Sequence, residues 1–267
     1  MAPINQILNK GVGLADDVAR YIKVCAKKSI LETKPLQAKI NPKELGYIFP
    51  DGSITFQTEK AAQNYARNIC MNQGLLPASE QVEIAVLRQK NRILGSANGS
   101  NKAVPLGDLL EPHRGKSNLV LEHYHPDLWG KGKTNPLSVG MDTNILGLNE
   151  IQAITAYNSL GQYSTIEKLP HFKGQRVRDF DDLFINSIKQ HCCTTDELVA
   201  RELLVKWRRS IFRISSKTKR KLEQIVGNCS KKMRTYMETI DFAQTEHKYL
   251  LDNAEKFGMK YSTNMNF

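Results

Sequence analysis

The chain has 267 residues, which is enough for one large domain or for a compact core domain with extensions. Its apolar content of 40% and charged content of 24% are typical of a soluble globular protein. No run of about 18 apolar residues occurs, so we expect no membrane-spanning helix. The net charge of +11 and the pI near 9.4 are unusual, and they indicate a basic surface or an anionic partner.

The first 75 residues are expected to form a helical N-terminal lead. Apolar residues at helical spacing predict one or two short helices within residues 1–35, and prolines then indicate an extended connection up to residue 50. A short strand is expected at residues 53–57. Thr58 can then cap a helix over residues 59–72 that ends at Gly74.

Strand and helix patterns alternate between residues 76 and 172. Branched apolar residues predict strands at residues 82–87, 92–96, 118–123, 151–157 and 162–168. Shorter helical patterns occur at residues 106–110 and 138–148. This interleaving predicts an α/β (α+β) fold, in which helices pack on a central sheet.

After a boundary near residues 172–178 the pattern becomes continuously helical, so we expect residues 173–267 to form a separate helical domain. One helix is expected at residues 177–190. Thr194 and Glu197 have the spacing of a capping box, which predicts a second helix to about residue 212. Two more helices are expected at residues 215–228 and 230–256.

This C-terminal region carries most of the excess charge. Between Arg201 and Arg234 there are twelve Lys and Arg residues against two Glu residues, a net charge of +10. These helices are either simply solvated or bind nucleic acid, an acidic protein surface or anionic lipid. No series of aromatic residues accompanies the charges, so binding of single-stranded nucleic acid by stacking of its bases is not favoured.

The cysteines are widely spread and lack the C-x-x-C spacing of zinc knuckles and redox sites: Cys25, Cys70, Cys192, Cys193 and Cys229. We therefore expect reduced thiols and a cytoplasmic protein. The N-terminal residues show no continuous apolar stretch typical of a Sec signal. Secretion as an effector, by a route that needs no such signal, is the alternative location.

The stretch 119–142, LVLEHYHPDLWGKGKTNPLSVGMD, combines residues that can bind a metal. His123 and His125 are two apart on a strand and therefore share a face, and Ser138 and Asp142 are four apart and share a helix face. Two imidazoles and one carboxylate could form a zinc site with an open position for water. Ser138 could equally serve only as the N-cap of the helix that carries Asp142.

A hydrolytic site also needs a base, which should be a carboxylate from another element. Glu80 and Glu83 both lie at the start of the strand expected at residues 82–87, and strand alternation puts them on opposite faces. The residue pattern does not choose between them. Glu122 precedes the first histidine and should face away from both histidines.

In these residues the chain resembles the JAMM/MPN (JAB) metalloprotease family, whose motif is a remote Glu, then His-x-His-Pro, then Ser-x-x-Asp. It is most similar to the RadC-type bacterial branch, because EQVEIAVLRQKNRIL precedes the stretch 119–142 in similar order and spacing. The resemblance covers roughly residues 80–168, about a third of the chain. One departure is Ser-Val-Gly-Met-Asp at residues 138–142, which has one residue more than the family motif.

The resemblance implies a central mixed sheet with packed helices for residues 76–172. It also implies Zn2+ bound by His123, His125 and Asp142, with Glu80 as general base and Ser138 assisting the water and the developing oxyanion. The implied function is that of a zinc metallohydrolase.

In such an enzyme the substrate would be an amide bond in a protein. The enzyme would be a peptidase or isopeptidase, either deubiquitinase-like with a ubiquitin-like conjugate as substrate, or like a bacterial effector or toxin. Two alternatives stay open. The first is a nucleic-acid-associated protein that uses the JAMM-like fold as a scaffold and the basic helices for binding. The second is a metal-dependent nuclease.

Overall fold

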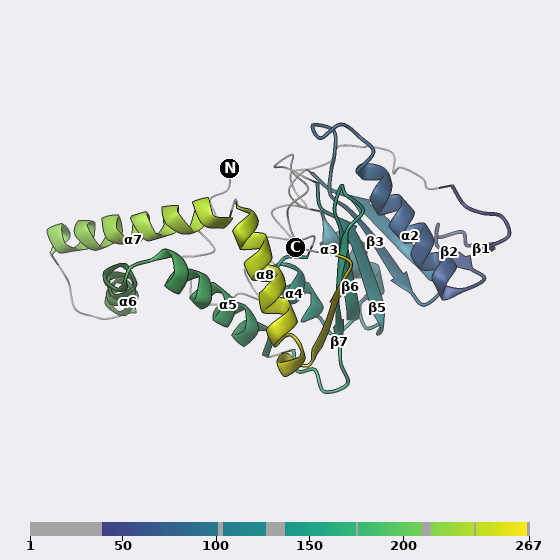
Figure 1. The fold of residues 1–267 in the computed structure, drawn as a ribbon. Helices are drawn as coiled ribbons and strands as arrows, with labels where there is room; N and C mark the ends of the chain where they lie inside the picture. Colours follow the sequence, from purple (N-terminus) through teal and green to yellow (C-terminus); the bar gives the residue numbers. More distant parts are fainter. Residues whose placement is uncertain are drawn as a thin grey trace.

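The computed structural model describes residues 39–100, 104–126, 137–174, 176–209, 215–237 and 239–265. One eight-stranded mixed sheet forms the centre, with helices on both faces (Figure 1), so the predicted α/β class is confirmed. Its strands are β1 (Leu45–Ile48), β2 (Ile54–Phe56), β3 (Ile84–Gln89), β4 (Arg92–Asn98), β5 (Leu119–Tyr124), β6 (Ile151–Tyr157), β7 (Tyr163–Lys168) and β8 (Met259–Thr263).

Short and long helices alternate with these strands and continue after them. They are α2 (Glu59–Gln73), α3 (Leu106–Leu110), α4 (Asp142–Leu146), α5 (Arg176–Cys192), α6 (Thr195–Arg209), α7 (Ser216–Met237) and α8 (Ile240–Asn253), with 3-10 turns at Glu111–His113 and Glu255–Phe257. None of these described helices combines the length and the apolarity that a membrane span requires.

The strand order in the sheet is β1-β2-β4-β3-β5-β6-β7-β8. Only β5 and β6 are parallel, and every other neighbouring pair is antiparallel. In the β3–β5 pair, Ala85 lies opposite His123 and Ile84 lies opposite Tyr124. This register decides which residues of β3 share a face with the histidines, because side chains alternate along both strands.

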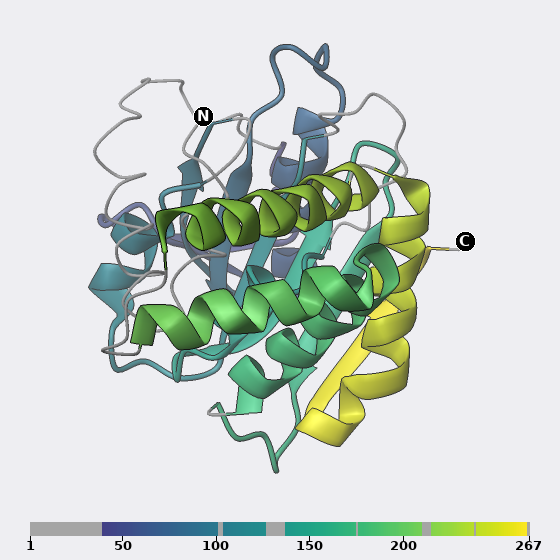
Figure 2. The ribbon, with the colours of Figure 1, turned by 90° about the vertical axis from the view of Figure 1, so that its left-hand side faces the viewer.

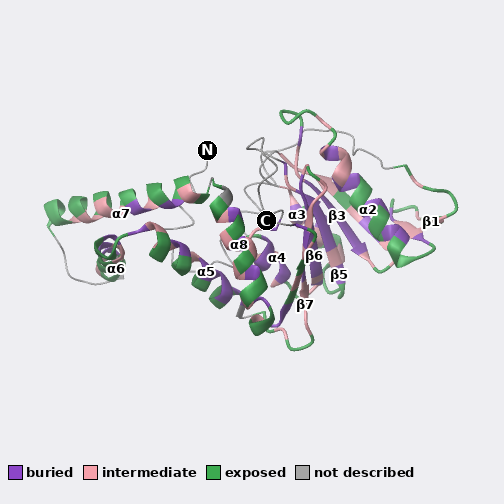
Figure 3. Ribbon diagram, viewed as in Figure 1, coloured by how far each residue is buried: buried purple, intermediate pink, exposed green. Residues whose placement is uncertain are grey.

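The two faces of the sheet bury different helices. On one face α2 packs its Tyr65 and Ile69 against residues such as Ile84 and Tyr124. On the other face α3, α4, α5 and α8 cover a second core that includes Leu87, Leu119 and Phe180; their positions around the sheet are visible in Figure 1. Figure 3 shows that buried residues fill the strands between these layers.

Two predicted helix starts are confirmed by their capping hydrogen bonds. The Thr58 hydroxyl oxygen accepts a hydrogen bond from the Ala61 N–H at 3.1 Å, and α2 follows. At α6 the Thr194 N–H donates to Glu197 Oε2 at 2.8 Å, while the Glu197 N–H donates to Thr194 Oγ1 at 3.3 Å. This reciprocal pair is the capping box that the sequence predicted.

The predicted division of the last helices is wrong. Instead of a break near residue 229, α7 runs without interruption from Ser216 to Met237, because Cys229 and Met233 are buried one turn apart on its inner side. The break comes at Thr239, whose hydroxyl accepts a hydrogen bond from the Phe242 N–H at 3.3 Å and begins α8. The helix expected at residues 138–148 is also shorter, since α4 covers only Asp142–Leu146.

The chain returns to the sheet after the helices, which the sequence did not predict. β8 pairs with β7, with Ile166 opposite Tyr261. The segments expected at residues 1–75, 76–172 and 173–267 therefore share one sheet, to which the first contributes β1 and β2 and the last contributes β8. The N-terminal helices expected within residues 1–35 lie outside the described residues.

The helices α6 and α7 project from the sheet as an arm (Figure 1), and they lie in front of the sheet in Figure 2. Their small core contains Phe184, Ile188 and Met233, and Cys193 forms a disulfide with Cys229 across it. The expectation of reduced thiols is therefore wrong for this pair. Cys70 and Cys192 are free thiols, and Cys25 lies outside the described residues.

Candidate metal centre

The two histidines lie together at the end of β5. His123 is buried, with 4% of its surface exposed, and its strand partner is Ala85, which belongs to the core beneath α4. His125 follows directly after the strand and is partly buried. The two rings meet edge to face with 4.5 Å between their centroids, so the predicted shared face is confirmed.

Asp142, the first residue of α4, brings a buried carboxylate to His123. Its Oδ1 lies 3.2 Å from His123 Nε2. Its Oδ2 accepts two hydrogen bonds from Ser138, one from the backbone N–H at 2.7 Å and one from the hydroxyl at 2.9 Å. Ser138 thus fixes one carboxylate oxygen and leaves the other turned toward the histidine.

The extra residue between Ser138 and Asp142 is accommodated by Gly140. Its φ is +96°, in the left-handed region that strains other residues, and no atom lies within 4 Å of where a Cβ would be. The Asp142 N–H still donates to the Ser138 carbonyl at 3.1 Å. The longer spacing therefore keeps the serine and the aspartate in contact.

Three possible ligand atoms, one each from His123, His125 and Asp142, lie within 4.8 Å of one another. His123 Nε2 is buried and is assigned no hydrogen bond in the part of the chain that the structure describes, where Asp142 Oδ1 lies 3.2 Å from it. A buried polar atom in this state costs free energy unless something binds it. Two imidazoles and a carboxylate this close together could hold a metal ion, and three protein ligands would leave a zinc ion one open position.

The opposite charges of Asp142 and the two histidines shift the pKa values in this cluster. Burial raises the pKa of Asp142, but the positive charges of His123 and His125 and the Ser138 N–H outweigh it and hold that pKa at about 2. Burial likewise lowers the pKa of His123, and the negative charge of Asp142 overcomes this effect, so that the His123 pKa is raised. Asp142 is therefore ionised at neutral pH, as a metal ligand must be.

The structure brings Glu83, and not Glu80, to this cluster. Glu80 is exposed in a turn, where its N–H donates to the Pro77 carbonyl at 2.8 Å. Glu83 precedes β3 on the face of Ala85, and continuing the β3–β5 register puts it opposite His125. Its backbone is fixed by two hydrogen bonds, from the Glu83 N–H to Ser100 at 2.8 Å and from the Gly99 N–H at 2.7 Å.

The environment of Glu83 suits a base. Burial raises its pKa to about 7; attraction to His123 opposes this shift, and the negative charge of Asp142 adds to it. General bases work best when their pKa lies near the operating pH. The resemblance implied this role for Glu80, through the match of the strand and its following turn to the family pattern. Strand alternation alone did not choose between Glu80 and Glu83.

Two carboxylates from the C-terminal helices hold the turn that carries Asp142, and the sequence analysis missed both. Asp181 in α5 accepts hydrogen bonds from Thr143 Oγ1 at 2.7 Å and Asn144 Nδ2 at 2.9 Å. Glu246 in α8 accepts one from the Val139 N–H at 2.7 Å. A signal was present in the sequence, since each acidic residue lies among apolar residues at helical spacing.

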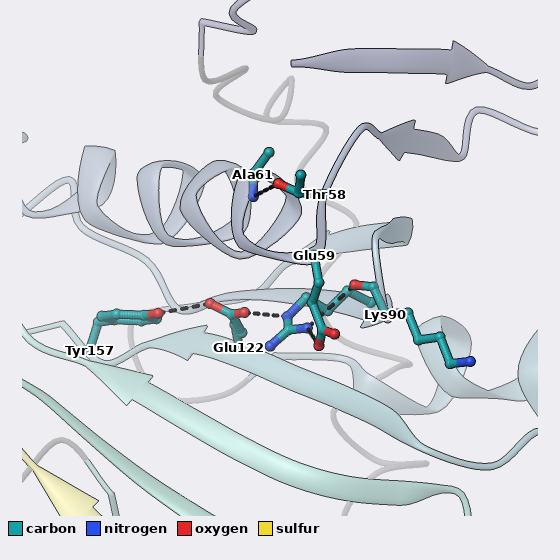
Figure 4. Close-up of polar contacts among 7 residues, drawn as sticks. Thr58, Glu59, Ala61, Lys90, Glu122 and Tyr157 are labelled. Atoms are coloured by element: carbon teal, nitrogen blue, oxygen red, sulfur yellow. Dashed lines mark hydrogen bonds and ion pairs between the residues drawn. The ribbon is translucent and has the colours of Figure 1, made fainter.

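Glu122 faces away from the histidines, as predicted, and lies in a separate polar network under α2 (Figure 4). Arg88 Nε donates to Glu122 Oε1 at 2.6 Å, and the Tyr157 hydroxyl donates to Glu122 Oε2 at 2.7 Å. Arg88 also donates to Glu59 Oε1 at 3.0 Å. Both oxygens of Glu122 are therefore occupied, which leaves this residue no part in the metal cluster.

The arrangement could thus hold a metal ion next to Glu83, a partly buried carboxylate of raised pKa. The resemblance to the JAMM/MPN family stays a hypothesis that rests on these residues and their geometry. Comparisons of the chain with protein-family models, with curated proteins and with solved structures found no significant match.

Proposed function

We propose that this protein is a metal-dependent hydrolase whose zinc ion is held by His123, His125 and Asp142. Two observations carry the proposal. One possible ligand atom from each of these three residues lies within 4.8 Å of the others, and the buried His123 Nε2 forms no hydrogen bond among the described residues. Zinc at such a site supplies Lewis-acid activation of water and of a substrate carbonyl or phosphoryl oxygen.

In this proposal Glu83 is the general base. It accepts the proton of the attacking water and later returns a proton to the leaving group. Its raised pKa of about 7 suits both directions of transfer at neutral pH. Support for Glu83 over Glu80 comes from burial and from the β3–β5 register, which puts Glu83 beside the histidines while Glu80 is exposed.

Ser138 acts in this proposal as a positioning residue. Its N–H and its hydroxyl both donate to Oδ2 of Asp142, so only Oδ1 points toward His123. This fixes which carboxylate oxygen faces the metal ligands. A role for Ser138 toward an oxyanion, which the resemblance implies, would require the hydroxyl to leave this hydrogen bond.

The substrate we propose is an amide bond in a protein, including the isopeptide bond of a ubiquitin-like conjugate. This choice rests on the resemblance to the JAMM/MPN family, and fold-level analogy alone does not fix a substrate. A phosphodiester is the second candidate, and the net charge of +10 between residues 201 and 234 favours it.

Metal content and a cleavage screen test the proposal together. We expect the purified protein to hold about one equivalent of zinc, which His123→Ala should lose. His171→Ala is the matched control, because His171 is an exposed histidine far from the cluster in sequence, and it should keep the zinc. Ubiquitin chains, an unfolded protein and nucleic acids are then tested as substrates with and without a chelator.

Loss of zinc and of chelator-sensitive cleavage in the His123→Ala protein alone would support the proposal. Equal zinc content in both variants would overturn the ligand assignment. Cleavage that survives the chelator would overturn the assignment of a metal-dependent mechanism.

A further inference from the structure

The outer face of α7 is a second surface with a defined chemistry. The inner side of this helix packs into the arm through Cys229 and Met233, which are buried in the cluster that also contains Phe184 and Ile188. The opposite side faces solvent along the whole helix, as the exposed residues in Figure 3 show. Figure 2 shows that this helix lies at the outside of the molecule.

Five cations lie on this solvent side, and we call them the outer cations: Lys217, Arg220, Lys221, Lys231 and Arg234. Arg220 and Lys231 are 11 residues apart, which is close to three helical turns, so both ends of the helix present their charges on one face. From Lys217 to Arg234 the face is about 25 Å long at 1.5 Å per residue.

The remaining cations of α7 are engaged elsewhere. Lys219 lies 3.8 Å from Glu223, and Lys232 lies 2.9 Å from Glu197. Within the described part of the chain, none of the outer cations forms an ion pair. The charges of the outer cations are therefore available to a binding partner.

The exposed residues between the outer cations are mostly small or polar, and the one acidic residue among them, Glu223, pairs with Lys219. Gln224, Gly227 and Asn228 continue the same exposed face, and no atom lies within 4 Å of where a Cβ of Gly227 would be. A glycine inside an exposed helix costs about 1 kcal/mol relative to alanine. Here it leaves the helix backbone open to close approach by a partner.

This chemistry selects one class of partner. An anionic membrane would be bound by basic residues beside apolar side chains that insert, and this face has none. A protein partner would be held by aromatic or large apolar side chains, and the outer face of α7 has none. Single-stranded nucleic acid would be bound by stacking of its bases on aromatic side chains, which this face also lacks. Closely spaced phosphates are the remaining match.

We propose that the outer face of α7 docks on the phosphate backbone of a nucleic-acid duplex without reading its sequence. Cations on a helix neutralise phosphates and release counterions, which gives affinity independent of base identity. The surface uses no residue of the metal cluster. The inference therefore stands whether the proposed hydrolase cleaves proteins or nucleic acids.

The test measures binding of the full chain to a fluorescent duplex of about 20 base pairs at several salt concentrations. With five phosphate contacts we expect the affinity to fall roughly 500-fold between about 50 and 200 mM salt. A variant with all five outer cations replaced by Gln should lose nearly all of this salt dependence. The half variant Lys231→Gln/Arg234→Gln should reduce the slope of log affinity against log salt by about 2.

The matched control removes five exposed lysines from other elements and so has the same net charge. It carries Gln at Lys43, Lys60, Lys116, Lys256 and Lys260. We expect its duplex affinity to stay within about threefold of wild type, with circular dichroism and melting curves verifying that every variant is folded.

Equal losses of affinity in the control and in the five-cation variant would show that binding depends only on the net charge of the protein, and this would overturn the proposal. Tighter binding to a single strand, or to vesicles with anionic lipid, would overturn the choice of partner. An unchanged affinity in the half variant would contradict the assignment of the face.

Discussion

Glu122 and His123 are neighbours on β5, yet they lie in opposite kinds of polar environment. Glu122 points under α2, where Arg88 and Tyr157 satisfy both of its oxygens. His123 points under α4, where its Nε2 is buried without a hydrogen-bond partner in the described part of the chain. Both side chains are almost fully buried, at 0% and 4% exposed. Burial of a polar residue thus says little about function, whereas a buried polar atom without a hydrogen bond marks a place where a ligand could bind.

Removing a ligand on the His123 face should have the largest effect. We expect Asp142→Asn to lower zinc affinity by more than about 100-fold and to abolish metal-dependent activity, because the carboxylate supplies the only negative charge of the proposed ligand set. Zinc competition with a chromophoric chelator measures this. Glu122→Gln removes the same charge one residue from His123, and zinc affinity comparable to wild type is expected there.

Glu83→Gln should lower kcat by about 10²- to 10⁴-fold and leave zinc content unchanged, because the amide cannot accept a proton. Glu80→Gln is the matched variant on the same segment and should retain wild-type activity, because Glu80 is exposed. The comparison needs rates and metal content measured on the same preparations. A large loss in Glu80→Gln with a small one in Glu83→Gln would return the base to the residue that the resemblance implied.

On the other face of β5, where both oxygens of Glu122 accept hydrogen bonds, we expect a substitution to change the stability of the protein. Glu122→Gln should lower the free energy of unfolding by about 3 kcal/mol, because it removes the negative charge 2.6 Å from Arg88 Nε and leaves the buried guanidinium only its ion pair with Glu59. Urea denaturation measures this difference. If unfolding is unchanged but zinc is lost, the two faces of β5 are coupled and the contrast drawn between them is wrong.

Asp181 should give the smallest effect, and it should depend on pH. Burial raises its pKa to about 7 and the neighbouring Asp182 adds to this, while hydrogen bonds from Thr143 and Asn144 oppose it. A carboxyl whose pKa is higher in the folded state holds its proton more tightly there. Wild-type stability should therefore fall as the pH rises from about 4 to 7.

The Asp181→Asn variant should lack this part of the pH dependence. Melting temperatures of both proteins across this range test it. Parallel curves for wild type and variant would show that Asp181 does not titrate there.

The sequence predicted the local elements well where one pattern dominated. Thr58 and the Thr194–Glu197 pair marked helix starts correctly, because capping depends on residues three positions apart. The edge strand β8 escaped prediction because only Met259 in it is fully buried. The continuity of α7 through Gly227 and Asn228 also escaped, since packing of the inner face overrides their low helix propensity.

For the site, local spacing was enough to group His123 with His125 and Ser138 with Asp142. The choice of Glu83 over Glu80 was not available from the sequence, because it depends on the pairing of Ala85 with His123 between strands 38 residues apart. Asp181 and Glu246 were missed for a similar reason. Their targets are backbone and side-chain donors in a turn that is distant in the sequence.

The same long-range contacts set the order in which the site can be completed during synthesis. The turn of Asp142 depends on Glu246, and the sheet is finished only when residues 259–263 pair with β7. A chain still emerging from the ribosome therefore carries both histidines long before it can fix their carboxylate partner. The proposed metal site would therefore be complete only after Glu246 and the residues of β8 have been synthesised.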